Sequence, residues 1–187
     1  MLFYIKKYLS LEIVITLLLG GVGYWQIKLH NFPIKLRPEK YAVVCGLAGF
    51  FWLALWTLLA QRSYGIFKGR AYVQNLTATL AKQFVKAGPL QMILGGVTAA
   101  FGKEVFFRGF LQPWLGPVPA SLLFMAAHFG NREIRVISLW SVFQGLYLGL
   151  FYTWTGNLLV PMIAHGPFDI GGMIYFRSFM RNTRRAA

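Results

Sequence analysis

The chain has 187 residues, of which 57% are hydrophobic and only 13% are charged. These fractions lie far from the averages of soluble domains and exclude an ordinary soluble protein. The 19 basic residues against five acidic ones give a formal net charge of +14. Because the basic residues mainly flank apolar segments, their pattern is typical of membrane orientation, and we expect no nucleic-acid partner.

Six apolar segments follow one another along the chain. A transmembrane helix needs about 20 predominantly apolar residues, and only the fourth segment is clearly shorter. We therefore predict an all-α, polytopic membrane protein with about six transmembrane helices. The segments cover residues 8–27, 41–60, 88–115, 117–129, 136–154 and 157–176.

The first segment has two interpretations. Lys6 and Lys7 precede an apolar run, which also fits a cleaved signal peptide. Glu12 lies inside the run and the aromatic pair Tyr24 and Trp25 lies near its end. Because aromatic pairs anchor transmembrane helices at the interface, we favour a retained helix.

Basic residues are distributed unevenly between the two sides that six spans would create. With the N-terminus inside, thirteen Lys and Arg residues fall on the inner side, among them Arg132 and Arg135, and four fall in the outer loop at 28–40. Cytoplasmic loops carry an excess of Lys and Arg. We therefore predict that both termini are cytoplasmic.

The chain divides near residue 87. Residues 1–87 hold two transmembrane helices and a polar linker, in which residues 72–84 are expected to form an amphipathic helix on the cytoplasmic surface. Residues 88–187 hold a functional core and a basic C-terminal tail. Cys45 is the one cysteine and is interpreted as a small buried hydrophobic residue.

Three pairs of residues, each with at least one ionisable side chain, recur at one-turn spacing inside the core. Glu104 and Arg108 are four residues apart, and so are Phe124 and His128. His165 and Asp169 repeat this spacing in the last segment, after the turn signal Thr155-Gly156-Asn157. Residues four apart share one helix face, and ionisable groups inside a membrane indicate a functional site by default.

These residue types are suited to hydrolysis. A carboxylate or an imidazole can take a proton from water. Imidazole, carboxyl and amide groups can stabilise the oxyanion that forms on a peptide carbonyl. Zinc bound by His128, His165 and either Glu104 or Asp169 is an alternative, although no two histidines share a helical turn as they do in metalloproteases.

The three motifs, in this order and spacing, resemble the CAAX protease and bacteriocin-processing family of intramembrane proteases. The pattern of that family is two adjacent glutamates, an arginine four residues after the second, then Phe-x-x-x-His, then His-x-x-x-Asn or Asp. The resemblance covers residues 88–176. It implies a protease core of the glutamic type in which Glu104 is the base or its support and is held by Arg108. It also implies that His128 helps to activate water, and that His165 with Asp169 supports the oxyanion.

Lys103 stands where the family has its first glutamate, the water-activating base. Three interpretations follow. Glu104 acts as the base together with His128, or Lys103 pairs with Asp169 and the charges are redistributed, or the chain binds a substrate without cutting it.

We expect an intramembrane endopeptidase that cleaves a membrane-anchored protein or peptide near the bilayer surface, such as a C-terminal anchor or a CAAX-type substrate. One alternative is a catalytically inactive relative that acts as a membrane binding or immunity protein. Another is a small transporter, which would more often carry an inverted repeat. The partners would be the lipid bilayer and the substrate, with no organic cofactor and no metal, and the location would be the bacterial cell membrane. The sequence indicates no particular oligomeric state.

Overall fold

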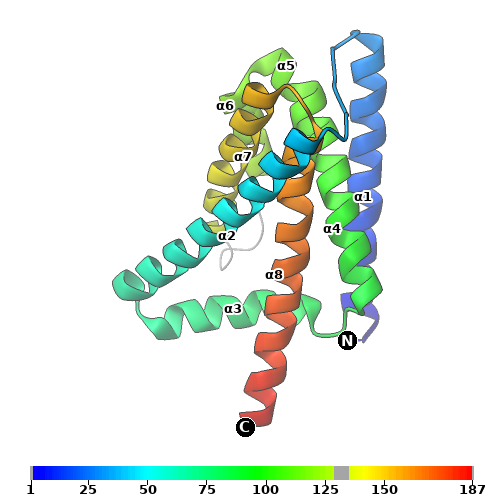
Figure 1. Cartoon of the computed structure of the whole chain (residues 1–187). Helices are drawn as coiled ribbons and strands as arrows, with labels where there is room; N and C mark the ends of the chain where they lie inside the picture. Colours follow the sequence, from blue (N-terminus) through cyan, green and yellow to red (C-terminus); the bar gives the residue numbers. More distant parts are fainter. Residues whose placement is uncertain (1, 129–134, 187) are drawn as a thin grey trace.

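The computed structural model describes residues 2–128 and 135–186. Within these ranges the fold consists of helices, joined by short connections, with an isolated bridge between Lys35 and Asn157 as its β-type pairing. Figure 1 shows the long helices α1, α4 and α8 running side by side. The prediction of an all-α, polytopic membrane protein is confirmed.

The N-terminal part consists of two long apolar helices and a shorter polar one. They are α1 (Leu2–Leu29), α2 (Lys40–Lys68) and α3 (Arg70–Phe84). Gly69, with a φ of 88°, adopts the left-handed conformation that allows the chain to turn between α2 and α3. A helix was predicted over residues 72–84 and is present, while its place on the cytoplasmic surface stays a prediction.

The C-terminal part begins with one interrupted helix and ends with two long ones. The first consists of α4 (Pro89–Glu104), the π-helix η1 (Val105–Leu111) and α5 (Gln112–Leu115). It is followed by α6 (Pro117–Ala126), α7 (Arg135–Thr155) and α8 (Leu159–Ala186), and α8 continues through Pro167. Phe129 and Arg132, which belonged to the predicted fourth segment and inner loop, lie outside the described residues.

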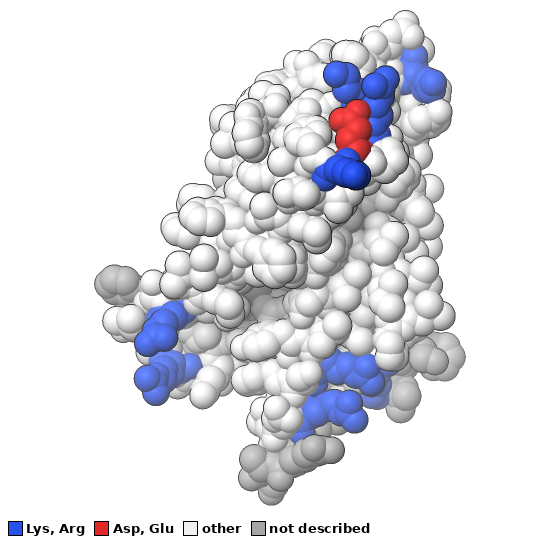
Figure 2. All heavy atoms as spheres, viewed as in Figure 1, with Lys and Arg blue, Asp and Glu red and all other residues white. Residues whose placement is uncertain are grey.

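Three helical stretches of the described residues are long and apolar enough to cross a membrane: Leu11–Leu29, Lys40–Ile66 and Pro89–Leu115. Pro117–Ala126 is a shorter apolar helix. Figure 2 shows Lys and Arg side chains at the two ends of the visible face, with an uncharged band between them. This distribution suits a bilayer whose hydrocarbon core is flanked by polar interfaces. The count of six spans stays a prediction.

Glycines bring the helices around α4 into close contact. A Cβ atom at Gly102 of α4 would clash with the Thr16 carbonyl oxygen of α1, and one at Gly23 would lie 2.8 Å from the Phe106 Cα. Helices in membranes associate largely through such small residues, because lipid tails provide no hydrophobic drive between helices. The close approach places the middle of α1 against the end of α4.

The predicted turn before the last helix is present and well bonded. Gly156 has a φ of 61°, and the Asn157 Oδ1 accepts a hydrogen bond from the Leu159 N–H at 3.1 Å, as a helix cap. The Asn157 Nδ2 donates to the Arg37 carbonyl at 2.8 Å. Asn157 therefore fixes both the start of α8 and the loop between α1 and α2.

Candidate functional site

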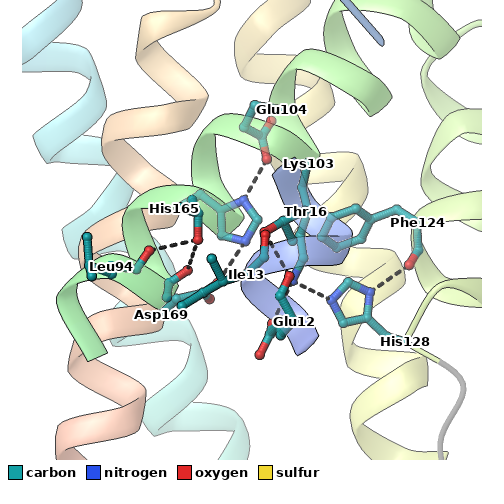
Figure 3. A network of polar contacts seen from close by, with 12 residues as sticks. Glu12, Ile13, Thr16, Leu94, Lys103, Glu104, Phe124, His128, His165 and Asp169 are labelled. Atoms are coloured by element: carbon teal, nitrogen blue, oxygen red, sulfur yellow. Dashed lines mark hydrogen bonds and ion pairs between the residues drawn. The ribbon is translucent and has the colours of Figure 1, made fainter. Parts of the chain in front are cut away.

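Glu104 is the centre of a buried chain of charged contacts. Its Oε1 lies 3.1 Å from the Arg108 Nη1 and 2.6 Å from the His165 Nδ1, and its side chain is 0% exposed (Figure 3). A buried charge is tolerated only when it is paired and hydrogen-bonded. Arg108 and His165 supply that pairing, while the buried Oε2 has no hydrogen-bond partner among the described residues.

The helix changes type immediately after Glu104. Residues Val105–Leu111 form a seven-residue π-helix, and the Gln112 N–H donates to the carbonyl of Phe107, five residues earlier. π-Helical segments are rare and often occur at functional sites. The sequence spacing predicted the Glu104–Arg108 pair, and the pair is formed, but spacing alone did not indicate the wider helix in which Arg108 lies.

Arg108 and Gln112 extend from this segment to the backbone of α7. The Arg108 Nη2 donates to the Gly145 carbonyl at 2.9 Å, and the Gln112 Nε2 donates to the Gly149 carbonyl at 2.8 Å. The Arg108 guanidinium also lies 4.6 Å from the centre of the Phe124 ring. Sequence analysis missed both glycines, although their G-x-x-x-G spacing is a known sign of close helix contact in membranes.

His165 joins Glu104 to Asp169. Its Nδ1 contacts Glu104, and its Nε2 lies 3.2 Å from the Asp169 Oδ2. The His165 side chain is buried, whereas that of Asp169 is 24% exposed. A ring that donates to both carboxylates must carry a proton on each nitrogen. The predicted oxyanion role of His165 and Asp169 would need one of these contacts to open.

His128 lies apart from the buried chain. Its Nδ1 is 2.7 Å from the Phe124 carbonyl, and its Nε2 is 3.4 Å from the Lys103 Nζ. The Phe124 ring lies 4.5 Å from the His128 ring and 6.0 Å from the His165 ring, measured between centroids. The Phe124 ring is therefore a common neighbour of the two imidazoles.

Lys103 extends away from Glu104 toward α1. Its Nζ lies 3.4 Å from the Glu12 Oε1, and its side chain is 12% exposed (Figure 3). Sequence analysis allowed a pair between Lys103 and Asp169. Among the described residues no such ion pair is formed, because the Lys103 ammonium reaches Glu12 and Asp169 contacts His165.

A cavity of about 290 Å³ lies beside Lys103. Its polar lining includes Glu12, Lys103 and His128, and Glu104 is not among the residues that line it. Its other walls come from the middle of α1, the end of α3, η1 and the residue that follows α6: Leu11, Ile15, Thr16, Leu19, Gln83, Phe84, Phe107 and Ala127. The cavity can accept an apolar segment with a polar group directed at Lys103 and His128.

No group of three His, Cys, Asp or Glu side chains in residues 2–128 and 135–186 is arranged to hold a metal ion. Of the donors that the sequence could offer to zinc, His128 and His165 both lie near the Phe124 ring, at 4.5 Å and 6.0 Å between ring centroids.

Comparison with known proteins gives a family match over the part of the chain that carries the three motifs. Residues 85–171 match the family described as type II CAAX prenyl endopeptidase Rce1-like. These residues form an Rce1-like domain. The domain includes Lys103, Glu104, His128 and the His165–Asp169 motif, whereas Glu12 precedes it. The family resemblance found in the sequence is confirmed.

A similar protein is the uncharacterized protein YpbD of Bacillus subtilis (strain 168), which is 43% identical to this chain over 93 residues. The match covers 47% of this chain and 47% of YpbD. The chain thus spans about half the length of this curated relative. No solved structure matches the chain. The Rce1-like domain and the apolar helices together identify an integral membrane protein with a domain of an endopeptidase family.

Proposed function

We propose that the chain is an intramembrane peptidase that cleaves a membrane-anchored protein or peptide near the bilayer surface, with C-terminal anchors and CAAX-type segments as its substrate class. The observation that carries this proposal is the buried Arg108–Glu104–His165 chain directly beside an apolar cavity that His128 lines. A fixed polar core next to an apolar cavity is the arrangement expected of a site that holds a peptide bond in lipid.

His128 is the general base in this proposal. Its contact with the Phe124 carbonyl places a proton on Nδ1, since a carbonyl only accepts. In the neutral ring the Nε2 is then the acceptor, and it points toward the Lys103 side of the cavity. A water molecule bound there gives its proton to Nε2, and its oxygen attacks the peptide carbonyl.

Glu104 supports this site rather than acting as the base. Its side chain is fully buried, and its Oε1 is held by both Arg108 and His165. A carboxylate in this position can orient its neighbours and balance their charge, but it does not reach the cavity. Asp169 contacts the Nε2 of His165, so the two carboxylates hold the imidazole in one orientation.

A second function is favoured by one observation. The Lys103 ammonium lies 3.4 Å from the His128 Nε2, at the position where the resemblance calls for a carboxylate base. A cation there opposes the build-up of positive charge on His128. The competing function is therefore a non-catalytic membrane binding or immunity protein that holds an anchor segment in the same cavity.

The experiment is a cleavage assay in cells that co-express the full chain with tagged, membrane-anchored substrates. Wild type is compared with His128→Ala, Glu104→Gln and Lys103→Glu, and Glu39→Gln serves as a control in the exposed loop. We expect wild type and the control to shorten the substrate, and His128→Ala to leave it intact. If Lys103→Glu cleaves the substrate and wild type does not, the natural protein is a disabled protease and the peptidase function is refuted.

We also propose that both termini face the cytoplasm of a bacterial cell and that the cavity opens on that side. The cavity is lined by residues of the middle of α1 and by Gln83 and Phe84 at the end of α3. Both chain ends lie toward the same end of the molecule as α3 (Figure 1). Labelling of single cysteines at Gln83 and at Leu36 by a membrane-impermeant reagent tests this, since only Leu36→Cys should react in intact cells.

A further inference from the structure

Glu12 and Lys103 place opposite charges on two helices at one wall of the cavity. The two side chains are 3.4 Å apart, and both line the cavity together with His128. The Glu12 side chain is 46% exposed, so the pair faces the open space rather than the helix interface. Charges within a membrane segment are costly and generally mark a functional position.

Joining α1 to α4 does not explain this geometry. The two helices already pack at backbone distance through Gly20 and Gly102. The Lys103 Nζ also contacts a second group, because it lies at the same distance, 3.4 Å, from the Glu12 Oε1 and from the His128 Nε2. The ammonium is thus held between a carboxylate and the proposed base (Figure 3).

A hydrolytic site at this cavity needs a donor for the oxyanion. His165 is engaged on both ring nitrogens, by Glu104 and by Asp169, and is 1% exposed. The Arg108 guanidinium is buried and donates to Glu104 and to the Gly145 carbonyl. Among the described residues that line the cavity, Lys103 is the cation, and its Nζ lies 3.4 Å from the His128 Nε2, close enough to meet the oxygen of a carbonyl attacked from His128.

We propose that the Lys103 ammonium stabilises the oxyanion and that Glu12 is the positioning residue that holds this ammonium in place. The inference rests on the peptidase function proposed above. Glu12 then gives α1, which precedes the Rce1-like domain at residues 85–171, a role in the site. Lys103, which replaces the first glutamate of the family pattern, takes part in the reaction.

The steps balance without any further reactant. The His128 Nε2 takes a proton from water while the water oxygen forms a bond to the carbonyl carbon. The electron pair of the C=O double bond moves to the oxygen, and the Lys103 ammonium binds the resulting anion. When the pair returns, the C–N bond breaks, and the proton on His128 passes to the leaving nitrogen. The products are a carboxyl group and an amine.

The first test compares variants in the cleavage assay with purified full chain. We expect Lys103→Met to lower kcat by about 10²- to 10³-fold, the usual loss on removing one oxyanion donor, and Lys103→Arg to recover part of it. Glu12→Gln should lower kcat by about 10- to 100-fold with little change in KM, because the donor remains but is misplaced. Glu39→Gln is the matched control, an exposed acid in the loop before α2.

The double variant Glu12→Leu/Lys103→Leu separates a structural pair from a catalytic one. It removes both charges together and leaves neither unpaired, so a merely structural pair would retain both stability and activity. Our inference requires near-normal thermal stability and lost cleavage, because no ammonium then binds the oxyanion. An active double variant would overturn the inference and leave the peptidase function intact.

A binding measurement keeps the inference testable even if wild type cleaves none of the substrates. The probe is an apolar, Leu- and Ala-rich peptide in which a phosphinate replaces one amide, compared with the same peptide carrying the amide. Wild type should bind the anionic phosphinate at least about 10²-fold more tightly, and Lys103→Met should remove most of that preference. Equal affinity of wild type for the two peptides would refute the role of Lys103.

Discussion

The Nδ1 of His165 lies 2.6 Å from the Oε1 of Glu104, across the contact between α8 and the end of α4. Sixty-one positions separate the two residues in sequence. The approach depends on Gly96 of α4, where a Cβ would clash with the Ile170 side chain and lie 3.0 Å from the Gly166 carbonyl. Small residues thus allow two helices to bring an imidazole and a carboxylate into one buried contact.

Removing Arg108 should destabilise the protein strongly. In Arg108→Met the Glu104 carboxylate loses the Arg108 guanidinium and keeps its burial, and breaking a buried ion pair in this way costs about 3–5 kcal/mol. We expect a clear fall in the thermal midpoint measured by tryptophan fluorescence in detergent. Arg62→Met, at an exposed position of α2, is the control and should change little. Equal midpoints for the two variants would contradict the central place of the Glu104–Arg108 pair.

Substitution of Gly102 should separate α1 from α4. A Cβ at this position would clash with the Thr16 carbonyl, and inserting a methyl group into a tight contact costs roughly 1–3 kcal/mol. Gly102→Ala should therefore lower the thermal midpoint and the cleavage rate together, because Lys103 moves relative to Glu12. Gly21→Ala is the matched control, since a Cβ there meets no atom within 4 Å. A neutral Gly102→Ala variant would refute the close helix contact.

Filling the cavity should block cleavage without unfolding the protein. Ile15 and its neighbour Val14 are both exposed, but of the two only Ile15 is among the residues that line the cavity. We expect Ile15→Trp to raise KM at least about tenfold in the cleavage assay, because the indole occupies substrate space, and Val14→Trp to behave as wild type. If both variants cleave normally, the substrate binds elsewhere.

The two contacts of the Asn157 side chain can be separated by substitution. Asn157→Ala loses the cap of α8 and the bond to the Arg37 carbonyl, and loss of a cap alone costs about 1 kcal/mol. Asn157→Asp keeps an oxygen for the Leu159 N–H but loses the Nδ2 donor. We expect the midpoint of the Asp variant to fall between those of Ala and wild type. An Asp variant as unstable as Ala would show that the loop bond, not the cap, is the important contact.

The local pairs of the site could be predicted from the sequence because helix geometry alone fixes them. Glu104 with Arg108, Phe124 with His128, and His165 with Asp169 are each four residues apart, and all three pairs are in contact. Each helix needs only its own backbone to place such neighbours on one face.

Contacts between helices could not be predicted in this way. Sequence analysis allowed Asp169 as the partner of Lys103, and the choice of Glu12 instead follows from how closely α1 approaches α4 through glycine. The contact of His165 with Glu104, instead of an orientation toward the cavity, likewise follows from how the helices pack. Such choices depend on the packing of whole helices, which local spacing does not encode.

The π-helix η1 has a consequence for how this site tolerates change. A π segment is equivalent to one residue inserted into an α-helix, so the helix faces before and after Val105–Leu111 are out of phase by about 100°. Deleting a single residue there would restore an ordinary helix and rotate everything before it relative to everything after it. Lys103 and Gln112 could then no longer face α1 and α7 at once. The position of this extra residue sets the angular register between the cavity and the bundle behind it.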